Sequence, residues 1–169
     1  KLNRAIELAP YRDAYYIGLA NNYIALANKI AQQSGLNADV VKNINLAISS
    51  AKKAVEINPA KAVNNELLAL IYENAALYTK GGIIEYMKFL TDSYDKVIEL
   101  DPNNPAPYFR LALINSARAN VEQDQKEKTK YMSEAIRQYD LAISKKSTLS
   151  EAYYGKGIAY ERLENFNEA

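Results

Sequence analysis

The sequence of 169 residues contains no cysteine, no histidine and no tryptophan. Without cysteine there is no disulfide framework and no thiolate chemistry, and without histidine the commonest general base and metal ligand is missing. Lys and Arg number 21 against 20 for Asp and Glu, so net charge gives no attraction to nucleic acid or to an anionic membrane. No apolar run approaches the roughly 20 residues of a membrane span. We therefore expect no catalytic residue, cofactor or metal ion, no nucleic-acid partner and no direct membrane insertion by this segment.

The acidic residues and the pair of adjacent glycines also give little support to a chemical site. Asp92, Asp95 and Glu99 lie about one helical turn apart and could hold a hard cation, although such a row is more often a solvated helix face. Gly81-Gly82 is not followed by the Lys-Ser/Thr element of a phosphate loop. Neither pattern changes the expectation of a protein without catalysis.

Proline is scarce, with five residues, and its positions mark the joints of the chain. After an apolar helix end at residues 97–100, the run from Asp101 to Pro105 cannot continue a helix, because proline lacks the amide hydrogen and clashes with the preceding turn. Pro105 then suits the first turn of a new helix, where a missing N–H costs nothing. Similar joints occur at Pro10, at Pro59 and, in degenerate form, at Ser147.

The joints belong to an internal repeat, which two series of residues measure independently. A small residue in the first helix of each unit occurs at Ala20, Ala69, Ala112 and Gly157. A small or β-branched residue near the end of the second helix occurs at Ala5, Ala54, Val97 and Ala142. Both series are spaced by 49, 43 and 45 residues, and each late residue precedes the next early one by 15. The chain is therefore predicted to repeat as helical hairpins.

These landmarks resemble those of the tetratricopeptide repeat (TPR) family, whose unit has about 34 residues. The family pattern is aromatic-x-x-Leu-small-x-x-Tyr, followed by Ala, aromatic, Ala and Pro. The best match runs from Tyr153 to Ala169, with Gly157, Tyr160 and Phe166 on consensus places. The other units match at Tyr16, Leu19, Ala20, Tyr23, Ala47, Ala54 and Pro59, at Leu68, Ala69, Tyr72, Tyr94 and Pro102, and at Tyr108, Leu111, Ala112, Ala135, Tyr139 and Ala142.

The resemblance implies an all-α fold, a right-handed α-solenoid of antiparallel helix pairs that forms a TPR-like superhelix. We expect residues 1–12 to be the tail of a preceding unit, residues 13–61, 62–104 and 105–149 to be repeats, and residues 150–169 to be the first half of a truncated repeat. Stacked repeats bury each other's faces, so the truncated ends are expected to expose Leu163 and Phe166 and to permit self-association.

The extra length of each unit lies between its two helices, so the hairpin tips are predicted to be extended. The apolar stripe of the first long helix, residues 12–33, continues at helical spacing, which predicts a helical tip. Ser34-Gly35 would end this helix, and Asp39 would cap the next one.

The other two tips have different sequence signals. Gly81-Gly82 is predicted to break the second hairpin. The third hairpin has no glycine or proline at its tip, and we place the tip near residues 122–126, where Asp124 and Glu127 have capping-box spacing. One long bent helix is the alternative for this third unit.

In TPR proteins the first helix of each unit lines the concave face, and this rule assigns the candidate binding residues. They are Ile17, Asn21, Ile24, Glu66, Leu70, Glu73, Phe109, Arg110, Leu113, Tyr154, Ile158 and Glu161. The apolar members would contact a partner, and the acidic ones would favour Lys or Arg beside its apolar anchors. The alternative is that curvature of the solenoid buries part of this face. The carboxylate clamp of the chaperone-binding subgroup is not supported, since only Asn21 and Arg110 match it.

These features favour a non-catalytic protein–protein interaction scaffold, as a fragment of a larger protein, that binds a peptide or helix of a partner on its concave face. One alternative is a helical TPR appendage of a larger bacterial membrane or cell-envelope enzyme, because the long hairpins resemble those attached to O-antigen ligase-like proteins of surface-polysaccharide assembly. A second alternative is a self-assembly domain.

Overall fold

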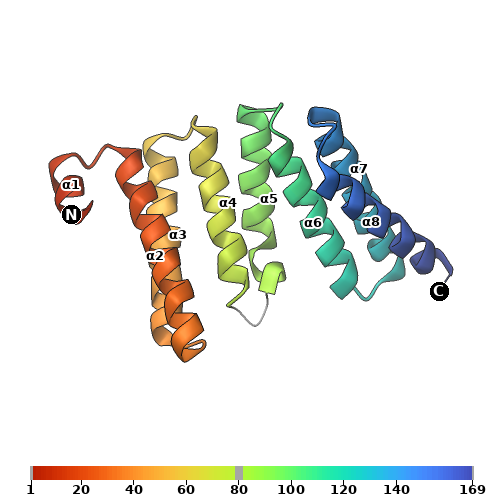
Figure 1. The fold of residues 1–169 in the computed structure, drawn as a ribbon, viewed down its shortest axis with the longest axis horizontal. Helices are drawn as coiled ribbons and strands as arrows, with labels where there is room; N and C mark the ends of the chain where they lie inside the picture. Colours follow the sequence, from red (N-terminus) through yellow and green to blue (C-terminus); the bar gives the residue numbers. More distant parts are fainter. Residues whose placement is uncertain (1, 79–81, 169) are drawn as a thin grey trace. The chain divides into compact units, whose positions relative to one another are not determined.

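The described part of the chain consists of α-helices joined by short turns (Figure 1). The structure is a computed structural model and describes residues 2–78 and 82–168. No strand occurs among these residues. The helices are α1 (Leu2–Leu8), α2 (Asp13–Ser34), α3 (Ala38–Ile57), α4 (Ala62–Ala76), α5 (Gly82–Leu100), α6 (Pro105–Val121), α7 (Gln125–Lys145) and α8 (Ser150–Glu168). They fall into two compact units, Lys1–Leu100 and Asp101–Ala169.

The first unit contains α1 to α5, and its helices pack as antiparallel pairs (Figure 1). α2 packs along α3, α4 packs along α5, and α3 also contacts α4. Ala20 and Ala69 have no exposed surface, and their small side chains let neighbouring helices approach closely. At Gly18 of α2, an added Cβ would lie 3.3 Å from a Leu2 methyl group of α1. Small residues therefore occupy the helix contacts that the repeat pattern identified.

The extended tip of the α2–α3 hairpin is helical and has its own apolar core. Ala27 of α2, Val40 and Ile44 of α3, and Ala75 of α4 are buried together there. Residues 25–33 lie in α2, and residues 83–88 lie in α5 at the next tip. The prediction of helical tips is confirmed, and burial of apolar surface, at about 25 cal/mol per Å², stabilises this added length.

Of the two helix caps predicted at the first tip, the structure confirms Gly35 at the end of α2 and places a different residue at the start of α3. Gly35 ends α2 with φ +69°, a conformation that favours glycine, and its N–H donates to the Ala31 carbonyl at 3.0 Å. Asn37 caps α3, because its side-chain oxygen accepts from the backbone N–H of Asp39 at 3.0 Å and from the following N–H at 3.1 Å. The prediction that Asp39 is the cap is wrong, since α3 begins at Ala38 and Asp39 falls within its first turn.

The second hairpin breaks where glycine was expected. α4 ends at Ala76, and α5 begins at Gly82, which has φ +53°. The preceding Gly81 lies outside the described residues. The positive φ at Gly82 explains the preference for glycine there, because a side chain would be strained in that conformation.

The second unit contains α6, α7 and α8, with α6 and α7 forming a complete hairpin. α6 ends at Val121, and Asp124 caps α7 by accepting from the N–H groups of Lys126 and Glu127, both at 3.0 Å. The predicted reversal at residues 122–126 is confirmed, and the alternative of one long bent helix is wrong. α8 packs against α7 and contacts α6.

The sequence predicted that the truncated end of the chain, in the last turns of α8, would expose Leu163 and Phe166. Leu163 is half-buried, and the side chain of Phe166 lies outside those that the structure describes. Earlier in the same helix, Tyr153 and Tyr160 are about half exposed, at 51% and 47%.

Candidate functional site

A cleft of about 520 Å³ lies between α6 and α8, with α7 forming its floor. Its volume is in the range of ligand-binding pockets. Its lining residues are Phe109, Leu113, Ser116, Met132, Tyr139, Ser150, Glu151, Tyr154, Gly155, Ile158, Ala159 and Arg162. Both α6 and α8 are the first helices of their hairpins in the repeat register, so the cleft lies on the face that the sequence assigned to binding.

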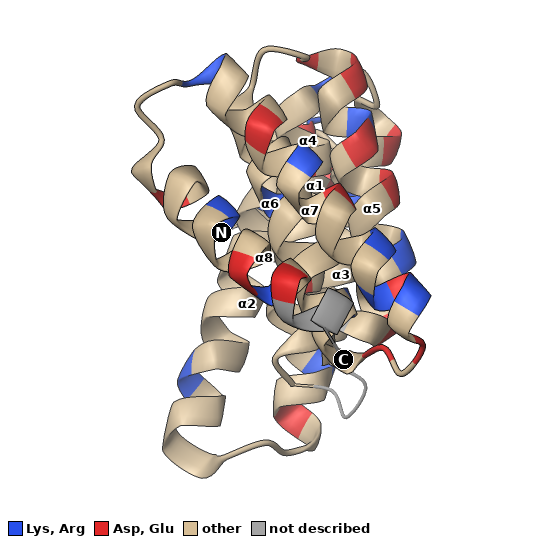
Figure 2. Cartoon of the chain, turned by 90° about the vertical axis from the view of Figure 1, so that its right-hand side faces the viewer, with Lys and Arg blue, Asp and Glu red and all other residues tan. Residues whose placement is uncertain are grey.

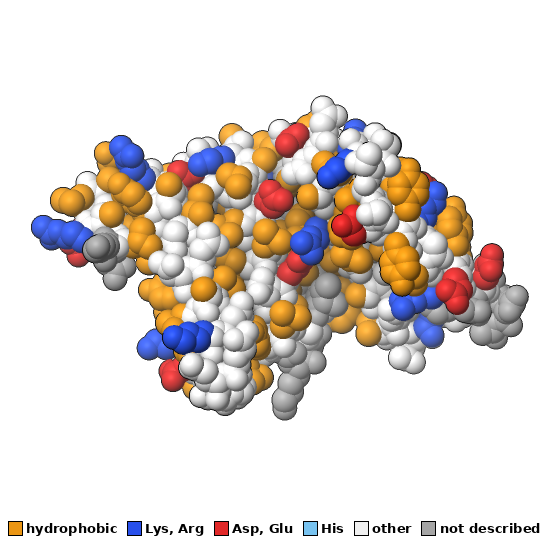
Figure 3. Space-filling view, in the orientation of Figure 1, with side chains coloured by type: hydrophobic (Ala, Val, Ile, Leu, Met, Phe, Trp, Pro, Cys, Tyr) orange, Lys and Arg blue, Asp and Glu red, His pale blue; other side chains and the backbone are white. Residues whose placement is uncertain are grey.

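The walls of the cleft are mainly apolar and partly open to solvent. Phe109 and Leu113 project from α6, and Tyr154 and Ile158 project from α8. Tyr154 is 74% exposed and Leu113 is 40% exposed, whereas Phe109 and Ile158 are half-buried. Figure 3 shows hydrophobic side chains gathered over α8. Exposed apolar side chains that cluster in this way usually mark an interaction surface.

The floor of the cleft is held by Tyr139 of α7, which is only 2% exposed. Its ring lies 6.0 Å from the Phe109 ring, centroid to centroid, at an angle of 56°. α8 can approach this ring because residue 155 is glycine: an added Cβ would lie 2.6 Å from the tyrosine hydroxyl oxygen. Burial raises the pKa of Tyr139, although a hydrogen bond with Ser116 and the positive charge of Arg162 act in the opposite direction.

The charged residues of the cleft lie at its two ends. Glu151 is in the first turn of α8, where hydrogen bonds from its own backbone N–H and from the Ser150 hydroxyl lower the pKa of its carboxyl. Arg162 is near the other end, and its Nη1 donates to Asn120 Oδ1 at 3.0 Å, which joins α8 to α6. Figure 2 shows acidic and basic positions along α8. The cleft is thus apolar along its middle and of opposite charge at its ends.

Comparison with known proteins gives both a sequence match and a structural match. The family model described as a tetratricopeptide repeat matches residues 93–129. The crystal structure of MamA protein aligns with a TM-score of 0.67 and 19% identity, over 99% of this chain and 72% of that chain. A second crystal structure of MamA has a TM-score of 0.61 and 19% identity, over 98% of this chain and 77% of that chain. No curated protein matches the sequence.

Residues 93–129 of this chain match a tetratricopeptide repeat, and the chain has the fold of a TPR solenoid. The predicted resemblance and fold class are confirmed: the fold is an all-α, right-handed α-solenoid of antiparallel helix pairs. A TPR solenoid is a protein-interaction scaffold and is typically non-catalytic. The comparisons do not favour the alternative of an appendage to a cell-envelope enzyme.

Four of the predicted concave-face residues of the TPR array come together in the cleft, namely Phe109, Leu113, Tyr154 and Ile158. Arg110 and Glu161, which were predicted with them, do not line it. Arg110 is half-buried and Glu161 is exposed.

The predicted residues of the first unit lie on α2 and α4 and form a less open surface. Asn21 is exposed, whereas Ile17, Ile24, Glu66, Leu70 and Glu73 are half-buried. Glu73 already has a partner, because the buried Tyr94 hydroxyl donates to its Oε1 at 2.8 Å. This carboxylate therefore helps to hold α5 against α4.

The sequence reasoning missed the residues of the cleft floor. Met132 and Tyr139 belong to a second helix, α7, and the family rule carried over only first-helix positions. A register signal for Tyr139 existed, since it and Tyr94 occupy equivalent places, three residues before Ala142 and Val97. Each tyrosine is hydrogen-bonded to the first helix of its own hairpin, Tyr94 to Glu73 and Tyr139 to Ser116.

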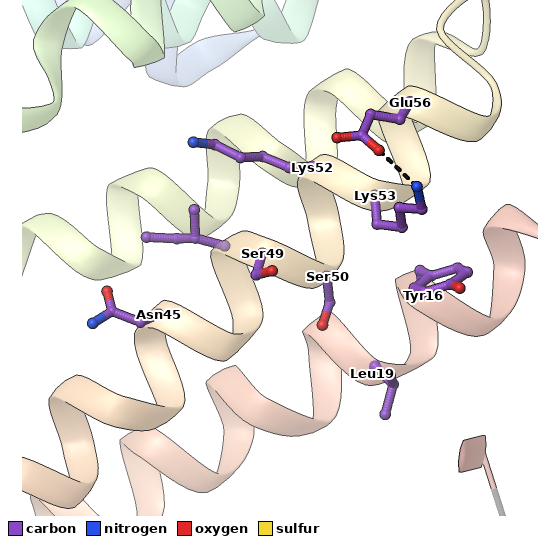
Figure 4. Close-up of a pocket in the computed structure, with 9 residues that line it drawn as sticks. Tyr16, Leu19, Asn45, Ser49, Ser50, Lys52, Lys53 and Glu56 are labelled. Atoms are coloured by element: carbon purple, nitrogen blue, oxygen red, sulfur yellow. Dashed lines mark hydrogen bonds and ion pairs between the residues drawn. The ribbon is translucent and has the colours of Figure 1, made fainter. Parts of the chain in front are cut away.

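A second hollow of about 610 Å³ lies on the α2–α3 hairpin (Figure 4). Several of its polar groups already have partners within the chain. Lys53 Nζ donates to Glu56 at 2.8 Å, the Ser50 hydroxyl donates to the Leu46 carbonyl at 2.7 Å, and the Lys52 ammonium lies 5.7 Å from the centre of the Phe89 ring. This hollow offers fewer apolar contacts than the cleft of the second unit and is the weaker candidate.

The described residues contain neither a metal-binding cluster nor a membrane-spanning helix. Within residues 2–78 and 82–168, no group of three or more His, Cys, Asp or Glu side chains is placed to hold a metal ion. None of the helices in this part of the chain is both long and apolar enough to cross a membrane.

Proposed function

We propose that the array holds a peptide or helix of a partner protein on the face formed by its first helices, with the α6–α8 cleft as the main contact. The observation that carries this proposal is the convergence of Phe109, Leu113, Tyr154 and Ile158 on one open cleft. The predicted residues of α2 and α4 would extend the same kind of contact in the first unit. The proposal keeps residues 13–61, 62–104 and 105–149 as the repeat units and residues 150–169 as a half unit.

A protein partner fits the cleft better than a polar metabolite does. Interface cores are enriched in aromatic side chains, and a few of these usually carry most of the binding free energy. The walls supply an aromatic residue from each helix, Phe109 and Tyr154, beside two aliphatic residues. The charged groups lie at the ends of the cleft, so an apolar segment can enter without burying an unpaired charge.

The test is selection of ligands from a displayed library of random twelve-residue peptides, followed by affinity measurement by fluorescence anisotropy. We expect the variant Phe109→Ser with Leu113→Gln to weaken binding of the selected peptides by at least about tenfold, which equals about 1.4 kcal/mol. Val121→Gln is the matched control, because Val121 ends the same helix and is 54% exposed but does not line the cleft. This control should bind as the native chain does.

A second variant separates binding from folding. Tyr154 is 74% exposed, so Tyr154→Ser removes little buried surface and should leave the melting temperature nearly unchanged while it weakens binding. If the Phe109 and Leu113 changes unfold the unit and Tyr154→Ser leaves binding intact, those two residues belong to the core and the proposed site is wrong. Self-association of the chain through the cleft would also contradict a separate partner, and would appear as a concentration-dependent mass.

A further inference from the structure

The two charged residues of the α6–α8 cleft lie on the same helix and far apart, so that one end of the cleft is acidic and the other is basic. Arg162 follows Glu151 by eleven residues in α8. At 1.5 Å per residue this places their backbones about 16 Å apart along the helix. The side chains between them that line the cleft are apolar or glycine: Tyr154, Gly155, Ile158 and Ala159.

Each charge is fixed at its end by local structure. The Glu151 carboxylate accepts from the Ser150 hydroxyl at 3.2 Å and lies at the N-terminus of α8, where the helix dipole favours a negative charge. Arg162 donates to Asn120, and a guanidinium has several N–H donors, so this bond occupies only part of its capacity. A ligand therefore meets a carboxylate at one end and a guanidinium at the other.

We propose that the cleft selects an extended segment of a partner protein in which a basic residue and an acidic residue flank apolar side chains, the basic residue pairing with Glu151 and the acidic residue with Arg162. This inference rests on the proposed function and adds the sequence pattern of the ligand. An extended chain advances about 3.3 Å per residue, so about five residues would separate the two charges.

The size of the cleft agrees with an extended segment. A cavity of about 150 Å³ holds one benzene molecule, so 520 Å³ accommodates about three groups of ring size. A helical ligand would be about 10–12 Å wide and would need about eleven residues between the same two charges.

The proposed ligand pattern also differs from the sequence-based prediction, in which Glu161 was expected to attract the basic residue. Glu161 does not line the cleft, whereas Glu151 does.

The test uses the hexapeptide Lys-Ala-Leu-Phe-Ala-Glu and two relatives, one with Glu in the first position and one with Lys in the last. We expect the native chain to bind the first peptide about tenfold more tightly than either relative, because each relative replaces an attraction by a repulsion. Glu151→Lys should reverse the preference at the basic end, and Arg162→Glu should reverse it at the acidic end. Glu161→Lys, which makes the same charge change as Glu151→Lys outside the cleft, should retain the native preference.

Peptides selected from the random library give an independent readout. The native chain should select Lys or Arg about five residues from Asp or Glu, with apolar residues between them, and Glu151→Lys should lose the selection for the basic residue. Binding that depends on Tyr154 but is insensitive to both charge reversals would overturn this inference and leave the proposed function standing. Absence of any binding, or selection of helical peptides with a spacing of about eleven, would also overturn it, and the former result would overturn the proposed function as well.

Discussion

The two units differ in how their neighbouring first helices are joined. In Lys1–Leu100, α2 and α4 are linked near both ends. The Asp13 carboxylate accepts from Lys61 Nζ and from Asn64 Nδ2, both at 3.0 Å, and at the far end the Tyr78 hydroxyl donates to Asn28 at 2.8 Å. These bonds hold the two helices together where the second unit has its cleft.

In Asp101–Ala169, the corresponding helices α6 and α8 have only part of this arrangement. Asn28 and Asn120 lie eight residues after Ala20 and Ala112. Asn28 accepts a hydrogen bond from Tyr78, in the turn directly after α4, and Asn120 accepts one from Arg162 of α8. The register positions of Asp13 and Asn64, however, are occupied in α6 and α8 by Pro105 and Ala152, whose side chains form no hydrogen bonds. The register position of Lys61 is occupied by Leu149, so the polar link at the start of α2 and α4 has no counterpart between α6 and α8.

Asn64→Leu should lower the free energy of unfolding more than any of the other substitutions that test this difference between the units. Asn64 is fully buried, and its Nδ2 donates to Asp13, to the Ala54 carbonyl at 3.0 Å and to the Asn58 carbonyl at 3.2 Å. Leucine has a similar size but cannot form these three bonds, so we expect a loss of about 2–3 kcal/mol in the free energy of unfolding. Hydrogen exchange measured by mass spectrometry should show faster exchange in α2 and α4.

Asn115→Leu is the matched control in the second unit. Asn115 is half-buried, and its side-chain amide donates to the Leu111 carbonyl of its own helix at 3.0 Å. We expect a loss below about 1 kcal/mol. Equal losses from the two variants would contradict the idea that Asn64 links two helices.

Gly155→Ala tests the other side of the comparison, the floor of the cleft. The new methyl group would lie 2.6 Å from the Tyr139 hydroxyl, and this ring is buried and cannot move without shifting its neighbours. Overpacking of this kind typically costs about 1–3 kcal/mol, partly offset by the higher helix propensity of alanine. We expect a net loss of about 1–2 kcal/mol in urea unfolding, together with weaker peptide binding.

Gly157→Ala, two residues further along α8, should have the opposite sign. Nothing lies within 4 Å of an added Cβ at this position, so only the helix propensity changes, and we expect a gain of about 0.5–1 kcal/mol. Stabilisation by both variants would show that Tyr139 yields easily and that the floor of the cleft is not rigid.

The fold could be predicted because periodic small residues set the helix contacts. Ala20, Ala69 and Ala112 are completely buried, and spacing alone identified them. Spacing does not reveal which polar side chains will meet. The cap of α3 was misplaced because Asn37 and Asp39 are both good cap residues and only the first turn of the helix distinguishes them.

The cleft could be predicted in its walls but not in its floor. Phe109 and Tyr154 follow from the first-helix rule, whereas Tyr139 reaches the cleft from a second helix only because Gly155 leaves room for it. The same signal occurs at the start of the chain, where Gly18 faces Leu2 at equivalent register positions. Once the register is known, this pattern can be recognised in the sequence. It consists of a large residue on a second helix and a glycine on the first helix that follows it.

The last predicted difference between the two units is a dependence of stability on pH. The hydrogen bonds from Asn64 and Lys61 lower the pKa of Asp13 from its usual value of 3.8. A carboxyl whose pKa is lower in the folded state contributes stability above its unfolded pKa and loses this contribution as the pH falls through the folded pKa. The Asp13 side chain is 16% exposed, but that of Lys61 is 42% exposed and screened, so we expect Asp13→Asn to cost only about 1 kcal/mol at pH 7.

The measurement is the difference in unfolding free energy between the native chain and Asp13→Asn, from urea titrations at a series of pH values between 7 and about 2. The difference should be constant at neutral pH and shrink below pH 3.8, because the native carboxyl then becomes protonated and loses its charge-assisted bonds. Asp39→Asn is the control, since Asp39 is exposed and bonds through its backbone: its N–H donates to Asn37 and its carbonyl accepts from Asn43. A difference that stays constant down to pH 2 would mean that the Asp13 link does not depend on charge. In that case the Asn28–Tyr78 bond, the neutral bonds of Asn64 and packing would hold α2 against α4. The contrast with the cleft of the second unit would then not depend on the charge of Asp13.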